Sequence, residues 1–261
     1  MSRARQAERG SRKSKRGKGA RANSGYGDDT VVQFPGTEVS DDLTPKVKRD
    51  NTPIEARNEN QVLYLEQLNT KQLIFATGEA GCGKTFLSTA HAAKALLDKE
   101  VERIIVTRPV LESGENLGFL PGDISEKFAP YFRPVQDILE KRLGGTFLQY
   151  CLRPDVKKVE IAPFAYMRGR TFENAVVILD EAQNVTKAQM KMFLTRLGEN
   201  VTVIVNGDVA QCDLPRGVQS GLSDALQRFS TTSRIGVVEF TKDDCVRSEL
   251  CQEVLNAYEH D

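Results

Sequence analysis

Short runs of apolar, mostly β-branched residues recur along the chain, and polar or amphipathic stretches separate them. Such a run is typical of a strand that is buried on both faces, as in a parallel sheet. We expect strands over residues 73–77, 103–107, 159–163, 175–179, 201–206 and 235–240.

Helix-forming stretches with apolar residues at helical spacing lie between these runs. We expect helices over residues 56–68, 86–98, 134–143, 220–229 and 248–258, and a further helix carrying Met190, Phe193, Leu194 and Leu197. Strands that alternate with helices predict the α/β class, as a three-layer sandwich with a mostly parallel sheet. In such a sheet, ligands bind at the carboxyl ends of the strands.

The 261 residues include 36 basic and 36 acidic side chains, but the basic ones gather at the N-terminus. Residues 1–22 hold nine Arg and Lys against Glu8, a formal charge of +8, with almost nothing apolar. We expect residues 1–52 to be a disordered basic tail and polar linker, and residues 53–261 to be one domain. The tail is either an arm that binds nucleic-acid phosphates or a solvated segment that aids solubility.

No apolar run reaches the length of a transmembrane helix, and no signal-peptide core is present. The chain has five cysteines, an odd number, and no C-x-x-C motif, so neither a disulfide framework nor a zinc site is expected. These features predict a cytoplasmic protein without a membrane partner. With only two histidines, histidine-based catalysis is not expected either.

A glycine-rich loop follows the expected strand over residues 73–77 and precedes a helix. The loop satisfies the pattern G-x-x-x-x-G-K-[ST] at every fixed position. Its residues are Gly78, Glu79, Ala80, Gly81, Cys82, Gly83, Lys84 and Thr85. Glycines let successive N–H groups turn toward phosphate oxygens, and the helix N-terminus adds partial positive charge. We expect the loop to bind a nucleotide, with Lys84 on the β- and γ-phosphates and Thr85 on Mg²⁺.

Two acids, Asp180 and Glu181, end the apolar run over residues 175–179. Because this is the ligand-binding edge of a parallel sheet, we expect Asp180 to hold Mg²⁺ and Glu181 to orient or deprotonate a water. The strand before Asp180 and the strand before the glycine-rich loop should then be separated by at most one other strand. Gln211, after the run over residues 201–206, could sense the γ-phosphate or belong to an ordinary polar turn.

Gln61 and Tyr64 lie shortly before the glycine-rich loop. A glutamine amide can pair with adenine and an aromatic ring can lie against the base, so we favour adenine recognition. The alternative is that Tyr64 belongs to the core and Gln61 to the surface. Arg168 and Arg170, on either side of a glycine, either contact phosphates or form a solvated turn.

Several short motifs follow one another in a fixed order. They are residues 78–85, 107–109, 117–122, 168–172, 180–184, 194–198, 207–208, Gln211, 213–215 and 220–222. With these motifs the chain resembles the PhoH-like ATPases, the phosphate-starvation-inducible group of bacteria and phages, from about residue 53 onward. Two runs depart from the family: Cys82 replaces a common threonine, and Cys245-Val246-Arg247-Ser248 replaces Val-Val-Arg-His.

The resemblance implies a RecA-like P-loop NTPase core related to superfamily 1 helicases. It also implies ATP hydrolysis, ring-shaped homo-oligomers that are expected to be hexamers, and a link to RNA. Gln61 matches the family's adenine-contacting glutamine, and Gln211 matches a sensor-like motif. Arg247 becomes a candidate arginine finger, which would stabilise charge on the transferred phosphoryl group, here from a neighbouring subunit.

We therefore expect an ATPase with Lys84, Glu181, Gln211 and Arg247 in catalytic roles, coupled to remodelling of RNA or single-stranded nucleic acid. Two alternatives stay open. One is a P-loop kinase of a small molecule, with the long stretch between residues 110 and 158 as a substrate lid. The other is a nucleic-acid-binding protein in which ATP acts only as an assembly switch.

Overall fold

The computed structural model describes residues 48–109, 124–230, 232–246 and 253. Four sequence expectations therefore lie outside the described residues. They are the tail and linker up to residue 47, the motif over residues 117–122, Arg247, and all but Glu253 of the expected helix over residues 248–258.

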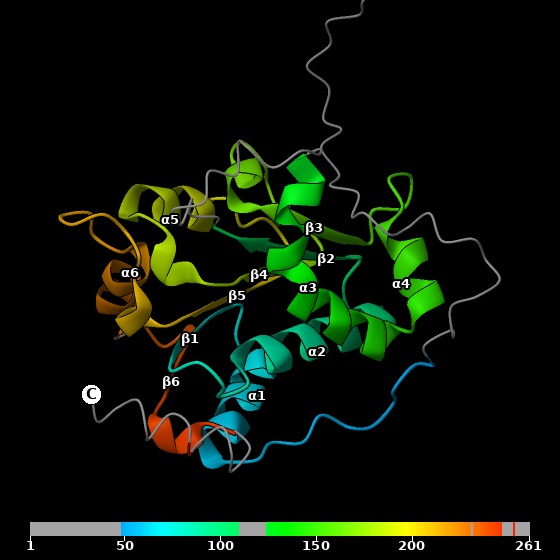
Figure 1. Cartoon of the computed structure of the whole chain (residues 1–261), viewed down its shortest axis with the longest axis horizontal. Coiled ribbons are helices and arrows are strands. Elements are labelled where there is room, and N and C mark those ends of the chain that lie inside the picture. The colour runs from blue at the N-terminus through cyan, green and yellow to red at the C-terminus, as the bar shows by residue number, and fades with distance from the viewer. Residues whose placement is uncertain (1–47, 110–123, 231, 247–252, 254–261) are drawn as a thin grey trace, which may run out of the picture.

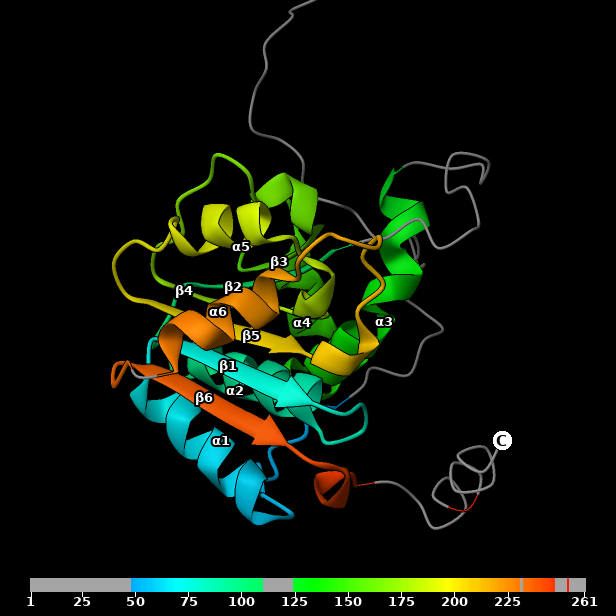
Figure 2. The ribbon, with the colours of Figure 1, turned by 90° about the vertical axis from the view of Figure 1, so that its left-hand side faces the viewer.

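The centre of the fold is a six-stranded sheet in which every neighbouring pair is parallel. The strands are β1 (Leu73–Gly78), β2 (Arg103–Arg108), β3 (Val159–Pro163), β4 (Ala175–Leu179), β5 (Val201–Gly207) and β6 (Ile235–Phe240). Their order is β3-β2-β4-β5-β1-β6. Each expected strand is confirmed, and β5 alone separates β1 from β4. In Figure 2 the arrowheads of β1, β5 and β6 point the same way.

Helices cover both faces of the sheet, as Figures 1 and 2 show. The helices α1 (Glu59–Thr70), α2 (Lys84–Leu97), α3 (Ile124–Leu143) and α4 (Gly145–Leu152) pack on one side. The helices α5 (Lys187–Leu194) and α6 (Gly221–Phe229) pack on the other. This is the predicted three-layer α/β sandwich around a parallel sheet.

The strands divide their side chains between two cores. On β1, Ile74 and Ala76 join the core under α1 and α2, whereas Leu73 and Phe75 join the core under α5 and α6. The same alternation holds along β4, where Val177 faces the second core. Because both faces are covered, the inner strands β1, β4 and β5 are continuous apolar runs, whereas the edge strand β6 alternates buried and exposed residues.

Two helices differ from the sequence expectation. The helix α3 begins at residue 124 rather than at 134, and it contains Pro130 and Pro134 in its interior. Proline removes a backbone donor and usually ends a helix, so the pattern placed the start too late. The helix α4 was not predicted; it begins at Gly145, directly after Gly144, which has a φ of 83°.

A short segment before α1 is fastened to the end of α3. Arg142 is 8% exposed and donates to the carbonyl oxygens of Thr52 (2.7 Å) and Asp50 (3.4 Å). Its guanidinium also lies 3.8 Å from the Asp50 carboxylate. Within the described part of the chain, none of the helices is both long enough and apolar enough to span a bilayer.

Candidate functional site

The glycine-rich loop connects the carboxyl end of β1 to the first turn of α2. Gly78 has a φ of 118°, and a Cβ there would lie 1.9 Å from the carbonyl oxygen of Phe240 on β6. Gly83, the residue before α2, has a φ of 86° and packs against the amide of Gln61. Both positions therefore require glycine, because an L side chain would be strained or would collide.

Lys84 begins α2 and folds back over the loop. Its Nζ donates to the carbonyl oxygens of Gly78 (2.5 Å) and Glu79 (2.6 Å). Burial lowers the pKa of this ammonium, which the carboxylates around it partly oppose. The Lys84 ammonium is therefore hydrogen-bonded to two carbonyl oxygens of the loop, and it must break these bonds to reach an incoming phosphate.

Thr85 and Asp180 meet across the sheet edge. The Thr85 hydroxyl donates to Asp180 Oδ1 at 3.0 Å, and Asp180 is 7% exposed. The backbone N–H of Asp180 donates to the carbonyl oxygen of Thr107 on β2, which fixes the acid at the end of β4. Burial raises the pKa of Asp180, and the neighbouring charge of Glu181 adds to this rise. A bound cation would favour the ionised form of this carboxylate.

Glu181 is held in position from two sides. Its backbone has a φ of 54°, which turns the chain sharply after Asp180. Its Oε2 accepts from Nε2 of Gln183 at 2.6 Å, and its Oε1 lies 3.5 Å from the guanidinium of Arg108. The carboxylate remains partly exposed, at 36% of its side chain, so it can meet a solvent water.

Asp208 and Gln183 belong to the same edge, and sequence reasoning assigned neither of them a role. Gln183 is 1% exposed, and its Oε1 accepts from the backbone N–H of Asp208 at 3.0 Å. Asp208 Oδ2 is buried and has no hydrogen-bond partner among the described residues. The position of Asp208, directly after β5, was the signal that could have found it.

A cavity of about 290 Å³ joins these groups. It is lined by Ala80, Gly81, Gly83, Lys84, Thr85, Phe86, Asp180, Glu181, Gly207, Asp208 and Gln211. The lining includes the cationic Lys84, the backbone of the glycine-rich loop, and the oxygen-bearing side chains of Thr85, Asp180, Glu181 and Asp208. The unpaired oxygen of Asp208 and the hydroxyl–carboxylate pair of Thr85 and Asp180 fit a hydrated Mg²⁺, and Lys84 with the loop backbone fits phosphates.

The structure places Gln61 beside the loop but gives its amide other partners. Nε2 of Gln61 donates to the Cys82 carbonyl oxygen at 3.0 Å, and Oε1 accepts from the Arg57 N–H at 2.9 Å. Adenine contact by Gln61 stays a prediction, and it requires the amide to exchange these bonds. The interpretation of Tyr64 as a base-contacting ring is wrong. Tyr64 is fully buried, and its hydroxyl donates to Asn206 Oδ1 at 2.8 Å.

The guanidinium of Arg170 is paired with an acidic side chain of the sheet. It forms a two-pronged ion pair with Glu160 on β3, in which its Nη2 lies 2.8 Å from Glu160 Oε2. The same guanidinium lies over the ring of Phe172. Arg170 thus ties the start of β3 to the loop before β4, and it is not arranged to contact a phosphate.

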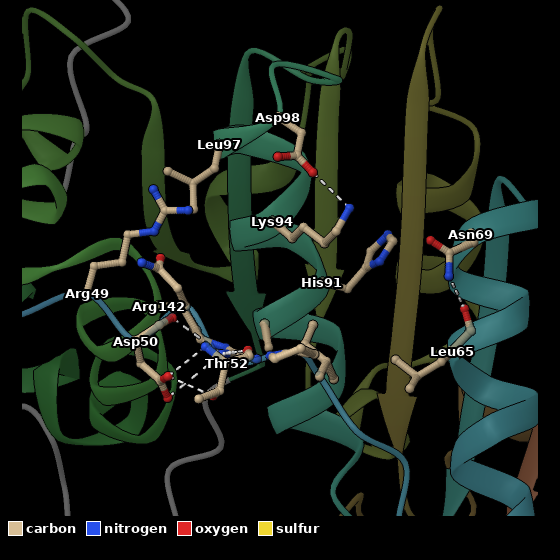
Figure 3. A pocket seen from close by; sticks show the side chains of 14 residues that line it. Arg49, Asp50, Thr52, Leu65, Asn69, His91, Lys94, Leu97, Asp98 and Arg142 are labelled. Carbon is tan, nitrogen blue, oxygen red and sulfur yellow. Dashed lines mark hydrogen bonds and ion pairs between the residues drawn. The ribbon is translucent and has the colours of Figure 1, made fainter.

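A second cavity, of about 640 Å³, lies between α1, α2 and the segment before α1 (Figure 3). Its charged groups are largely paired with one another, as in the contact of Lys94 with Asp98 at 2.8 Å and that of Arg142 with Asp50. Leu65 and Leu97 supply apolar walls. Because it has no glycine-rich backbone, this cavity does not resemble a phosphate site.

His91 projects from α2 into the second cavity, and it should make the fold sensitive to acid. Burial lowers the pKa of His91 to about 4, with a smaller contribution from Lys94. Below pH ~6.5 His91 therefore takes up a proton in the unfolded chain but stays neutral in the folded chain. The free energy of unfolding should fall by about 2 kcal/mol between pH 7 and 5. Urea unfolding at both values should detect the loss.

The matched control is the His91→Gln variant, which carries no titratable imidazole at this position. The wild-type loss should exceed the variant's loss by about 2 kcal/mol. Equal losses in the two proteins would contradict the assignment, because other groups would then carry the pH dependence.

The site and the sheet order together define the class of protein. A glycine-rich loop between β1 and α2, with acids at the ends of β4 and β5, makes the chain a P-loop NTPase. The PhoH-like protein family model matches residues 53–259. The chain belongs to this family.

Curated relatives agree with the family assignment. Protein PhoH of Escherichia coli (strain K12) is 70% identical over 229 residues, which cover 88% of this chain and 64% of that protein. The PhoH-like protein of Bacillus subtilis (strain 168) is 43% identical over 84% of this chain and 67% of its own length. The chain thus spans about two thirds of the length of these relatives.

Solved structures with a similar arrangement are distant in sequence. The large terminase of a thermophilic bacteriophage is 14% identical over 76% of this chain and 49% of that chain, with a TM-score of 0.49. The Pif1 helicase of Candida albicans is 16% identical over 78% of this chain and 44% of that chain, with a TM-score of 0.39.

Proposed function

We propose that the chain hydrolyses ATP with Mg²⁺ and uses the hydrolysis to remodel RNA or another single-stranded nucleic acid. The observation that carries the ATPase proposal is the convergence of Lys84, Thr85, Asp180 and Glu181 on one cavity. These residues come from two strand ends separated by β5, and the parallel order of the sheet brings them together.

The chain's own groups divide the work of binding. Backbone N–H groups of the glycine-rich loop and the N-terminus of α2 bind the β- and γ-phosphates, and Lys84 adds a full positive charge. Mg²⁺, held by Thr85 and Asp180, would supply charge neutralisation for the phosphate oxygens. Gln61 would contact adenine after its amide exchanges the bonds that it makes to Cys82 and Arg57.

Glu181 serves hydrolysis. Its carboxylate orients an attacking water and accepts its proton, while Gln183 and Arg108 keep the carboxylate aimed into the cavity. Gln211 lines the same cavity and would contact the γ-phosphate. The rate enhancement of this step comes from positioning and charge stabilisation, because phosphoryl transfer needs little covalent chemistry from the protein.

The nucleic-acid partner and the ring belong to the same proposal. The support for the partner is the +8 charge of residues 1–22, which suits phosphate backbones, together with the family resemblance. A ring of identical subunits, a hexamer by the same resemblance, would let Arg247 of one subunit reach the γ-phosphate held by the next. The action takes place in the cytoplasm.

Phosphate release from ATP without any added acceptor tests the proposal. We expect turnover under these conditions, and we expect single-stranded RNA to raise it. Turnover that requires a small-molecule acceptor would instead favour a kinase. A full-length variant with the nine basic residues of 1–22 changed to glutamine should lose the stimulation by RNA but keep the basal turnover. Equal stimulation of both proteins would remove the tail from the proposal.

A further inference from the structure

Two cysteine thiols face each other behind the glycine-rich loop. The Sγ atoms of Cys82, inside the loop, and Cys245, after β6, lie 2.9 Å apart although 163 residues separate them. Both are free cysteines. A disulfide bond is about 2.05 Å long, so the sulfurs would approach by only about 0.9 Å to form one.

The segment that carries Cys245 is firmly placed against the loop. The N–H of Val246 donates to the Gly81 carbonyl oxygen at 3.2 Å, and Cys245 Sγ lies 3.4 Å from the Ala80 carbonyl oxygen. Asp244, next to the cysteine, is 7% exposed, and its Oδ2 accepts from Nδ2 of Asn60 on α1 at 2.7 Å. The two sulfurs are therefore held together by contacts on both sides of the pair.

The two thiols differ in their access to solvent. Cys82 is fully buried, whereas Cys245 is only partly buried. Burial raises the pKa of the Cys82 thiol to about 12, with a further contribution from Cys245, so Cys82 keeps its proton at neutral pH. A small oxidant from solvent would therefore meet Cys245 before Cys82.

We propose that Cys82 and Cys245 are a redox modification site, at which a hydroperoxide drives formation of a reversible disulfide between the glycine-rich loop and the segment after β6. The Cys245 thiolate attacks the peroxide, breaks its O–O bond and becomes a sulfenic acid, with hydroxide as the leaving group. Cys82 sulfur then attacks the sulfenic sulfur and forms the S–S bond. The departing hydroxide takes the Cys82 proton, so two thiols and one hydrogen peroxide give one disulfide and two waters.

The consequence for nucleotide turnover rests on the proposed function. The disulfide would pull Cys82 toward the segment after β6. The carbonyl oxygen of Cys82 already accepts a hydrogen bond from Gln61, and Lys84 donates to the carbonyl oxygens of Gly78 and Glu79 in the same loop. Phosphate binding requires this loop to rearrange around Lys84. A displacement of about 1 Å in a catalytic arrangement can cost about a hundredfold in rate, so the oxidised protein should turn ATP over much more slowly.

Peptide mapping tests the bond itself, independently of any activity. After exposure of the full chain to hydrogen peroxide and blocking of free thiols, trypsin separates Cys82 on residues 72–84 from Cys245 on residues 243–247. Cys212 and Cys251 fall on other peptides, over residues 197–216 and 248–261. We expect the two peptides to appear joined, to separate on reduction with dithiothreitol, and to come from monomeric chains on a non-reducing denaturing gel.

Variants separate this bond from other oxidation. The Cys245→Ser variant should keep the basal turnover but resist inactivation by peroxide. The Cys212→Ser variant, which removes an exposed cysteine, should behave like wild type. Failure of the joined peptide to form, or inactivation of Cys245→Ser at the wild-type rate, would overturn the proposal. If the reduced wild type shows no turnover, the proposed function fails, while the peptide map still decides the bond.

Discussion

Replacing Lys84 with alanine should reduce ATP turnover by about a hundredfold or more and weaken ATP binding. The variant removes the one side-chain cation that begins α2 and lines the phosphate cavity. Alanine favours a helix at least as well as lysine does, so α2 should still form. Phosphate release and the binding of a fluorescent ATP analogue measure the two effects, and thermal unfolding checks the fold.

A matched control lies on the same helix. Lys94 is exposed, pairs with Asp98 at 2.8 Å and is distant along α2 from the loop. Lys94→Ala removes the same charge, and its effect on stability should stay within about 0.5 kcal/mol, with turnover near wild type. Similar turnover in Lys84→Ala and Lys94→Ala would exclude Lys84 from the phosphate site.

The inner part of the sheet could be predicted because its strands are buried on both faces. The strands β1, β2, β4 and β5 each carry a run of buried apolar residues that is typical of a covered sheet, whereas the edge strand β6 alternates buried and exposed positions. The loop and the acids followed from the same logic, since parallel strands send their carboxyl ends to one edge. The hydrogen bond from Thr85 to Asp180, between residues 95 positions apart, is the geometric outcome of that rule.

The remaining details depend on contacts that no local pattern encodes. Tyr64 was placed at adenine, but a buried tyrosine needs a partner for its hydroxyl, and Asn206 on a distant strand supplies one. The hydrogen bonds of the buried Gln183 could not be predicted for the same reason, because its partners Glu181 and Asp208 follow two different strands. The start of α3 was missed because tertiary packing outweighs the local cost of its prolines.

Replacing Glu181 with glutamine should separate ATP binding from ATP hydrolysis. The amide keeps the size of the side chain but cannot accept a proton from water, so turnover should fall by about 10²- to 10⁴-fold. Binding should persist or tighten, because the charge of Glu181 no longer opposes phosphate and no longer raises the pKa of the neighbouring Asp180. Phosphate release and equilibrium binding of ATP measure the two quantities on the same preparation.

The Glu239→Gln variant is the control, because Glu239 is exposed on β6 and its loss removes the same charge without touching the cavity. It should hydrolyse ATP like wild type. A strand-displacement assay on RNA then distinguishes a motor from a switch. A motor loses displacement in Glu181→Gln together with hydrolysis, whereas an assembly switch keeps its nucleic-acid function as long as ATP stays bound. Undiminished hydrolysis in Glu181→Gln would contradict the assignment of Glu181 as the base, whichever of the two mechanisms operates.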